Sequence, residues 1–445
     1  MRPEPLDKRC STHFKKPAGQ NRKRLHFKLS MNGAHILRKY EPAEWGGTET
    51  AVKRLLNGLG NHGVQSTVWC PAGKHTPAFD PIADSGHKVR RFHAFLPVSG
   101  ISAAQRMQLV ALGGNLMSFE LLWRLWREPK LDFIHSHALN RLAGIGLLVA
   151  RLRRIPFVVT VHGGAFDLPE KTRATLVEPL KGGWEWGKVF GWLLQSRSIL
   201  KNADAVLTCN PREAELLCSH YPRQRIVVQP HSVPTSVYER DHRVAARAAF
   251  PQIVGREVLL SVARIDPAKN QDWLLQQLPA LKRRFPNVLL VMAGANTHAE
   301  YWAGLQATIA RLGLSDHVHH VGGLPPGSDE LVGLFQEAKV LVLPSTNETF
   351  GLVILEAWAA GTAAISSRTS GAASLVRHRE NGWLFDIDNE AQFFAAAEEA
   401  LAQPETTRAF ADAGRQLAKK EFDAVVLAKR VKELYQSLSA EKRHR

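Results

Sequence analysis

The sequence contains few cysteines, and their spacing excludes one common class of metal site. Its 445 residues include only Cys10, Cys70, Cys209 and Cys218. None of them forms a CxxC pair, so a zinc ribbon is excluded. We interpret the scattered cysteines as free thiols, buried or half-buried, in a reducing compartment.

The sequence also lacks a segment suited to crossing a membrane or directing export. The longest apolar run, Leu142 to Ala150, stops at Arg151, well short of the ~18–20 residues of a membrane span. The basic N-terminus is not followed by the apolar stretch of a secretory signal. We therefore expect a cytoplasmic protein.

Positive charge is in excess, since 58 lysines and arginines face 41 aspartates and glutamates, for a net charge of +17. This balance favours an anionic partner, such as nucleic acid, anionic lipid or a phosphorylated substrate. No recognition helix, RNP motif or aromatic strand pattern supports nucleic-acid binding. We interpret the charge as phosphate-binding residues plus solvated basic tails.

Short apolar runs alternate with helical stretches along most of the chain, which predicts an α/β protein with parallel sheets. We expect a basic disordered tail over residues 1–24, a first domain over 25–232, a second over 233–425, and a C-terminal helix with a basic tail over 426–445. The boundary falls in Pro230–Ser236, a loop with two prolines. Doubly wound domains bind ligands at the carboxyl ends of their strands, so two of them are expected to face each other across a cleft.

The segment Leu343–Gly361 carries the strongest chemical signal. A buried strand is followed by a polar loop and then by a helix that begins near Phe350–Gly351 and ends at Gly361. The free amides at such a helix start suit a diphosphate. Glu348 lies in the loop and Glu356 in the helix, too far apart to form an acid/base pair but well placed to accept hydrogen bonds from sugar and ribose hydroxyls. Taken alone, Glu348 would read as a helix cap and Glu356 as a paired, buried carboxylate.

A pair of cations follows the first strand of the second domain. Arg264 and Lys269 lie in Ser261-Val-Ala-Arg-Ile-Asp-Pro-Ala-Lys. Cations at a strand end can neutralise a leaving diphosphate. Surface arginines and lysines are common, so this signal depends on its context.

Together these motifs resemble glycosyltransferase family 4, whose members have the GT-B fold. Glu348 and Glu356, with seven residues between them, match the two-glutamate motif of the family. Trp45–Glu49 resembles its glycine loop, and Val161–Gly164 resembles its histidine loop. The resemblance covers about residues 27–430. One departure is Pro230-His231-Ser232, where the family often has Asn-Gly after the proline.

The resemblance implies roles for individual residues. Glu356 would bind ribose hydroxyls, Glu348 would contact the transferred sugar, and His162 would lie by the reacting centre. Arg264 and Lys269 would stabilise the departing diphosphate, in place of a metal and without a cofactor. The implied donor-binding residues are Gly47, Arg264, Lys269, Glu348, Phe350, Gly351, Leu352 and Glu356.

The family is retaining, and the resemblance implies transfer of a hexose from a nucleotide-diphosphate sugar to a glycan or lipid-linked acceptor. Such a reaction serves the synthesis of cell-surface polysaccharide or glycolipid. Sugar-nucleotide 2-epimerases share the fold but need no acceptor, and we keep this activity as the alternative. A basic nucleic-acid-binding protein is the weaker one.

Two further features stay open. His135 and His137 suit either a metal pair or a hydrogen-bonded structural role, and the lack of nearby cysteines or carboxylates favours the second. Gln105–Arg127 and Gly183–Lys201 mix aromatic and basic residues. Helices of this kind suit the surface of an anionic membrane, peripheral on its inner face, or else pack their apolar sides on the sheet.

Overall fold

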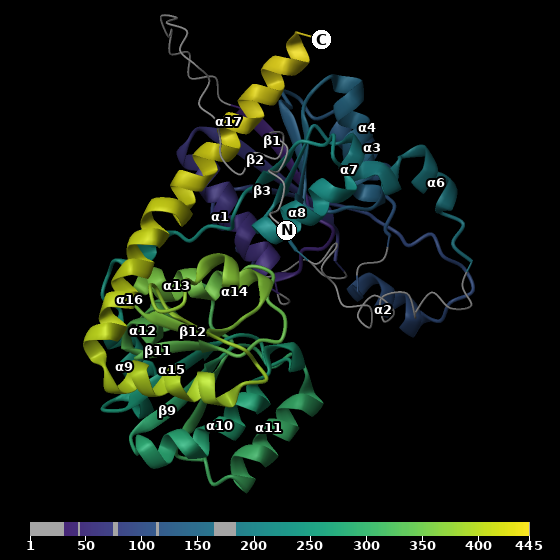
Figure 1. Ribbon diagram of the computed structural model, residues 1–445. Coiled ribbons are helices and arrows are strands. Elements are labelled where there is room, and N and C mark those ends of the chain that lie inside the picture. Colours follow the sequence, from purple (N-terminus) through teal and green to yellow (C-terminus); the bar gives the residue numbers. More distant parts are fainter. Residues whose placement is uncertain (1–30, 43–44, 74–78, 113–114, 164–183, 445) are drawn as a thin grey trace, which may run out of the picture. The chain divides into compact units, whose positions relative to one another are not determined.

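The computed structural model describes residues 31–42, 45–73, 79–112, 115–163 and 184–444 (Figure 1). The expected tail over residues 1–24 lies outside these ranges. The chain divides into two compact units. Unit 1 comprises Met1–Pro230 with Leu427–Arg445, and unit 2 comprises His231–Val426. The terminal residues from Leu427 onward, which the sequence assigned to a separate helix and tail, are thus part of unit 1.

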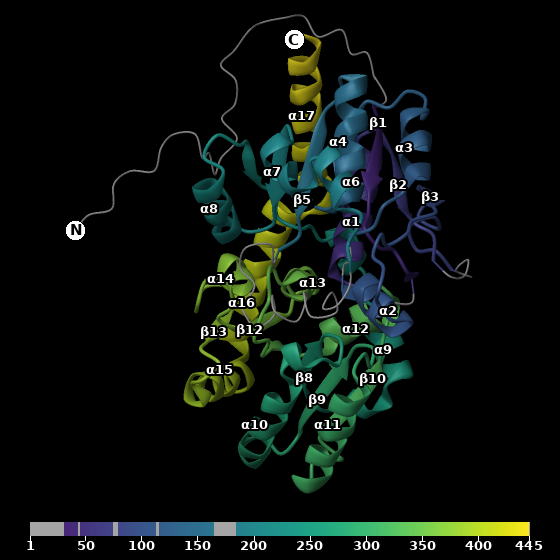
Figure 2. The ribbon, with the colours of Figure 1, turned by 90° about the vertical axis from the view of Figure 1, so that its right-hand side faces the viewer.

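The described part of unit 1 contains a parallel sheet with the strand order β3-β2-β1-β4-β5-β6-β7. Its strands are β1 (Met31–Ile36), β2 (Val64–Pro71), β3 (Lys88–Phe92), β4 (Phe133–Ser136), β5 (Phe157–Val161), β6 (Ala205–Thr208) and β7 (Ile226–Val228). The helices are α1 (Gly47–Asn61), α2 (Ala103–Leu112), α3 (Phe119–Trp126), α4 (Arg141–Arg153), α6 (Lys188–Leu193), α7 (Ile199–Asn202) and α8 (Pro211–His220). Helices α3 and α4 lie on one face of the sheet (Figures 1 and 2).

Unit 2 contains a second parallel sheet, with the order β10-β9-β8-β11-β12-β13. Its strands are β8 (Glu257–Val262), β9 (Val288–Ala293), β10 (Val318–Gly322), β11 (Val340–Leu343), β12 (Ala363–Ser367) and β13 (Trp383–Phe385). Its helices include α9 (Arg243–Ala249), α10 (Gln271–Arg284), α11 (Ala299–Arg311), α12 (Asp329–Glu337), α13 (Leu352–Ala360), α14 (Ser370–Leu375), α15 (Glu390–Ala402) and α16 (Pro404–Leu417). Helix α17 (Ala424–Arg443) begins in unit 2 and continues in unit 1.

Both sheets confirm the expected doubly wound α/β architecture. In each, the strand order reverses beside the first strand, between β1 and β4 in unit 1 and between β8 and β11 in unit 2. Ligands of open parallel sheets bind at the carboxyl ends of the strands at such a switch point. Continuous apolar strands such as β9, in which every residue is buried, are typical of a sheet covered on both faces.

Some elements were not predicted from the sequence. The edge strand β3 has the sequence Lys88-Val-Arg-Arg-Phe. Its three basic residues interrupt the apolar run by which the other strands were predicted. Gln105–Arg127 forms two helices rather than one, because Ser118 caps a new start at α3 by accepting a hydrogen bond from the Leu121 amide at 3.0 Å. Gly183–Lys201 is also broken, since Gln195 adopts a left-handed backbone with φ 52° after α6.

The structure bears on two expectations from the sequence, that the cysteines are free thiols and that no segment crosses a membrane. Cys70 and Cys209 are buried and form no disulfide, as expected. Cys218 is disulfide-bonded, so the expectation of free thiols was wrong for that residue. Among the described residues, no helix combines the length and the apolarity that crossing a bilayer requires.

Candidate functional site

The loop between β11 and α13 lies at the switch point of unit 2, and hydrogen bonds to its backbone carbonyls hold it in place. The Ser367 hydroxyl donates to the Ser345 carbonyl at 2.6 Å. The Gly371 amide donates to the Glu348 carbonyl at 2.8 Å. The loop is therefore tied to the end of β12 and to α14, and the side chain of Glu348 starts from a fixed backbone.

Helix α13 starts and ends at glycines, as the sequence predicted. Gly351 precedes its first residue with φ +92°, and Gly361 follows its last residue with φ +82°. A side chain is disfavoured in this left-handed region, so glycine permits both turns. The first amides of an α-helix have no acceptor within the helix, and the residue at the N-cap, Gly351, has no side chain that could accept from them. This helix start can bind an anion.

The predicted cation Lys269 and the predicted carboxylate Glu348 form an ion pair in unit 2. Lys269 Nζ lies 2.7 Å from Glu348 Oε2, and the two side chains are 22% and 18% exposed. The segments that carry them are joined by the Thr346 amide, which donates to the Ala268 carbonyl at 3.0 Å. Glu348 therefore binds a cation rather than capping α13.

Two further predicted residues of unit 2, Arg264 and Glu356, lie near this ion pair in the sequence. Arg264 precedes Lys269 in the same loop, and Glu356 follows Glu348 in the next helix, α13. Arg264 lies two residues after the end of β8 and is exposed, and its carbonyl accepts a hydrogen bond from Gln271 Nε2 at 2.8 Å. Glu356 lies within α13 and is only 7% exposed.

Phe350 is buried just before the helix start, and its ring lies against His231. The two ring centroids are 5.0 Å apart in an edge-to-face arrangement, and Phe422 lies on another side at 6.4 Å. His231 is the residue at which the sequence departs from the family pattern. The imidazole therefore packs on the ring that begins the anion-binding turn.

In unit 1, Gly47 is the exposed first residue of α1. The preceding Gly46 amide donates to Glu49 Oε2 at 3.1 Å, which closes the first turn of that helix. Burial raises the pKa of Glu49, and its bonds to backbone amides oppose this. Gly47 and His162 thus belong to unit 1, whereas the other predicted site residues belong to unit 2.

His162 follows β5 and lies in a cluster of histidines. Burial lowers its pKa to about 4, so the imidazole is neutral at physiological pH. Its Nε2 lies 2.8 Å from His137 Nδ1. His35 of β1, which the sequence analysis missed, joins the cluster because it pairs in register with His135 on β4. Only the assembled sheet reveals this neighbour, since about a hundred residues separate the two strands.

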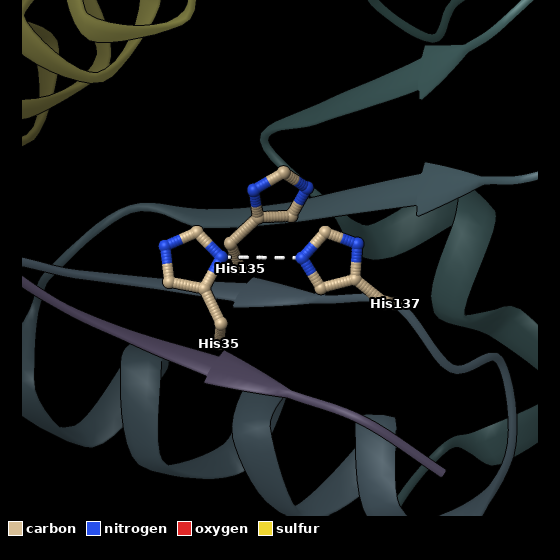
Figure 3. A group of neighbouring side chains, drawn as sticks. All are labelled: His35, His135 and His137. Carbon is tan, nitrogen blue, oxygen red and sulfur yellow. Dashed lines mark hydrogen bonds between the residues drawn. The ribbon is translucent and has the colours of Figure 1, made fainter. Parts of the chain in front are cut away.

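His35, His135 and His137 each place a nitrogen within 4.8 Å of the others (Figure 3). His135 Nδ1 lies 2.6 Å from the Tyr435 hydroxyl, and its Nε2 lies 2.6 Å from the Thr160 hydroxyl. Both ring nitrogens of His135 are therefore engaged by hydroxyl groups. Of the two roles left open, the structure shows the hydrogen-bonded one for this residue.

The buried histidines predict a loss of stability in acid. Burial lowers the pKa of His35 to about 3 from an ordinary 6.5, and that of His162 to about 4. Below pH 6.5 these histidines become protonated in the unfolded chain but stay neutral in the folded one. The free energy of unfolding therefore decreases by about 1.4 kcal/mol per histidine for each pH unit by which the pH is lowered. We expect a cost of about 2 kcal/mol per histidine at about pH 5, measured by urea unfolding. His35→Asn should reduce the pH slope by about one proton, and an unchanged slope would contradict the interpretation.

Comparisons with known proteins cover both units. Residues 45–237 match the family described as Glycosyltransferase Family 4, and residues 245–417 match the family described as Glycosyl transferases group 1. A D-inositol 3-phosphate glycosyltransferase of Streptomyces scabiei is 29% identical, over 83% of this chain and 82% of its own. The protein of the same name from an Arthrobacter species is 32% identical, over 66% of this chain and 67% of its own.

Solved structures share the fold at low sequence identity. The HepE protein (Alr3699) of Anabaena, solved in complex with UDP, has a TM-score of 0.69 at 17% identity, over 92% of this chain and all of its own. WaaG, a glycosyltransferase involved in lipopolysaccharide biosynthesis, has a TM-score of 0.61 at 17% identity, over 91% of this chain and 99% of its own. The two doubly wound domains are those of the GT-B fold.

Proposed function

The chain belongs to the group 1 glycosyl transferases of the GT-B fold, and we propose that it transfers a hexose, with retention, from a nucleotide-diphosphate sugar to a glycan or lipid-linked acceptor. The observation that carries the proposal is the Lys269–Glu348 ion pair in the loop that leads to the glycine start of α13. One site thus offers a cation and free amides for the diphosphate and a carboxylate for sugar hydroxyls. The Anabaena relative of this fold is known in complexes with UDP and UDP-glucose.

On donor binding, the ion pair would change partners. The diphosphate, which carries more negative charge than a carboxylate, would draw Lys269 Nζ away from Glu348. The released carboxylate would then accept hydrogen bonds from the sugar, so neither charge is left without a partner. Arg264, which is exposed, would supply the second cation for the departing diphosphate, and the two cations would serve where other transferases use a metal. Within unit 2, Glu356 and the amides of Phe350, Gly351 and Leu352 would complete the donor site, and Gly47 of unit 1 is the further donor-binding residue that the family resemblance implies.

Product analysis tests the proposal against the epimerase alternative. The protein is incubated with UDP-, GDP- and ADP-sugars, with and without acceptors, and the release of nucleoside diphosphate is followed. Release that depends on an acceptor, with an anomeric configuration in the product that matches the donor, supports retaining transfer. Conversion of the donor into its 2-epimer without any acceptor would overturn it.

The acceptor panel should separate two classes. Lipid-linked glycans test the proposed role in cell-surface polysaccharide or glycolipid synthesis. Inositol phosphate tests a phosphorylated polyol, because the relatives from Streptomyces scabiei and Arthrobacter are named for that acceptor. A basic chain suits either one, since both carry phosphate.

We further propose that unit 1 binds an anionic membrane surface, peripheral on the inner face. Several large apolar side chains of unit 1 are exposed, and the rings of Phe119 and Phe190 join α3 to α6 with centroids 5.6 Å apart. The guanidinium of Arg127 lies over Trp123 at 4.5 Å. Aromatic residues next to bases suit the boundary between lipid headgroups and acyl chains. The exposed apolar residues on or beside α2, α3 and α6 are Met107, Val110, Phe119, Trp123, Trp126, Trp184, Trp186, Val189, Trp192 and Leu193.

The strongest membrane effect is expected at Trp192, which is 78% exposed, and at its neighbour Leu193, which is 60% exposed. Replacing both with serine should weaken sedimentation with anionic liposomes at least about tenfold, because the apolar area removed is worth more than about 1.4 kcal/mol. Val244→Ser in unit 2, at an equally exposed residue, is the matched control and should bind as the unaltered protein does. Failure of the unaltered protein to sediment at low salt would refute membrane binding.

A further inference from the structure

Helix α10 begins with a buried glutamine that reaches back to the loop carrying both predicted cations. Gln271, the first residue of the helix, is 1% exposed. Its Nε2 donates to the Arg264 carbonyl at 2.8 Å. Lys269 lies between these two residues in the chain. One buried side chain therefore ties together the two ends of the segment that contains Arg264 and Lys269.

The bond to Arg264 fixes the orientation of the glutamine amide. A carbonyl oxygen can only accept a hydrogen bond, so the group that faces it is the NH2 of Gln271 and not its oxygen. The oxygen, Oε1, is buried and has no hydrogen-bond partner among the described residues. A buried polar atom without a partner destabilises the fold, and a methionine of similar length would bury no such atom. Locally unfavourable residues of this kind are expected at functional sites, so the glutamine has a role other than packing.

Other contacts hold the loop on either side of the bond that the glutamine makes. A Cβ on Gly294 would lie 1.8 Å from the Ala263 oxygen and 3.0 Å from the Arg264 nitrogen, so the chain after β9 packs directly against this backbone. Further along the loop, the Ala268 carbonyl accepts a hydrogen bond from the Thr346 amide at 3.0 Å. The carbonyl of Arg264 lies between these two contacts, and it is the one that the glutamine holds.

We propose that Gln271 is a positioning residue for the diphosphate of the sugar donor and touches no ligand itself. By holding the Arg264 carbonyl, it fixes the backbone from which the Arg264 guanidinium extends, in the same loop as Lys269. Cations on an ordered backbone bind an anion more tightly, because less ordering is needed when the anion arrives. The inference rests on the proposed function, since it takes the diphosphate as the ligand of the two cations.

Two variants of the full-length protein test this role. Gln271→Met keeps the length of the side chain and removes the N–H donor together with the unpaired oxygen. Gln277→Met is the matched control, because Gln277 is a second buried glutamine of α10, 8% exposed. Binding of UDP, GDP and ADP to both variants is compared with binding of uridine, guanosine and adenosine, which carry no phosphate.

Gln271→Met should weaken binding of the nucleoside diphosphate about tenfold or more, because losing one hydrogen bond to a charged group has at least this effect. Binding of the matching nucleoside should stay within about twofold. Gln277→Met should bind both as the unaltered protein does. Diphosphate binding that is unchanged in Gln271→Met would overturn the proposal.

Two measurements without ligand separate positioning from a general loss of structure. Amide hydrogen exchange over residues 264–269 should be about tenfold faster in Gln271→Met and unchanged in Gln277→Met. The melting temperature of Gln271→Met should not fall, because the unpaired oxygen is removed along with the bond. A lower melting temperature with equal losses of nucleoside and diphosphate binding would show a merely structural role and overturn the proposal.

Failure of the proposed function would give a different result. A protein that binds a nucleoside diphosphate but transfers no sugar would refute the transfer reaction and leave the role of Gln271 standing. A protein that binds none of the three diphosphates would refute the diphosphate site and the role of Gln271 with it. Where transfer is observed, kcat/KM for the donor should fall about tenfold or more in Gln271→Met, and an unchanged value would overturn the proposal.

Discussion

Replacing Glu356 with alanine is expected to lower sugar transfer and nucleotide binding by at least about a hundredfold. A charged carboxylate that accepts hydrogen bonds from two ribose hydroxyls contributes about 1.5–3 kcal/mol for each bond, and about 1.4 kcal/mol is a factor of ten. The carboxylate is almost fully buried within α13, so water cannot replace those bonds. Kd for the nucleoside diphosphate and kcat/KM for transfer measure the loss.

The design must separate ligand binding from folding, since Glu356 is buried. Glu356→Gln keeps the shape of the side chain and removes only the charge, and it should still lose most of the activity while melting near the unaltered temperature. Glu300→Ala changes an exposed glutamate in the first turn of α11 and should leave both properties unchanged. Transfer at the unaltered rate by Glu356→Ala would refute the assignment of the donor site.

Local patterns predicted the elements around the donor site well. The glycines that flank α13 are visible in the sequence, because only a few residue types tolerate the left-handed turns at positions 351 and 361. The strands β8, β9, β11 and β12 are apolar runs that only a sheet covered on both faces would bury. These signals lie within a few residues of the features they predict.

Contacts between segments that are distant in the sequence could not be predicted from such local patterns. The sequence identified Lys269 and Glu348 as separate ligands of one donor, but the 2.7 Å ion pair between them depends on the neighbouring positions of β8 and β11 in the sheet. His35 gave no signal at all, because a single histidine within a strand is ordinary. Its importance appears only when strand register places it beside His135 and within reach of His137.

Replacing Gly371 with alanine is expected to reduce transfer about a hundredfold, although Gly371 itself is not among the residues predicted to bind the sugar donor. A Cβ on Gly371 would lie 2.3 Å from the Phe350 nitrogen, 2.5 Å from the Thr349 carbonyl carbon and 2.6 Å from the Glu348 oxygen. All three atoms are backbone, so no side-chain rotation can relieve the overlap. The loop must move, and it takes the Glu348 carboxylate away from Lys269. A shift of about 1 Å in a positioned group can cost about a hundredfold in rate.

A matched glycine tests whether the effect arises from the loop or from glycine itself. Gly304 lies within α11, and nothing would lie within 4 Å of a Cβ there. Gly304→Ala should therefore retain full activity and gain about 0.5–1 kcal/mol of stability, because alanine loses less conformational freedom in a helix. Gly371→Ala should bind the nucleotide weakly and melt only slightly below the unaltered protein. Full activity in Gly371→Ala would show that the loop yields without displacing Glu348, and would refute the claim that the packing of the loop against Gly371 positions the carboxylate for the sugar.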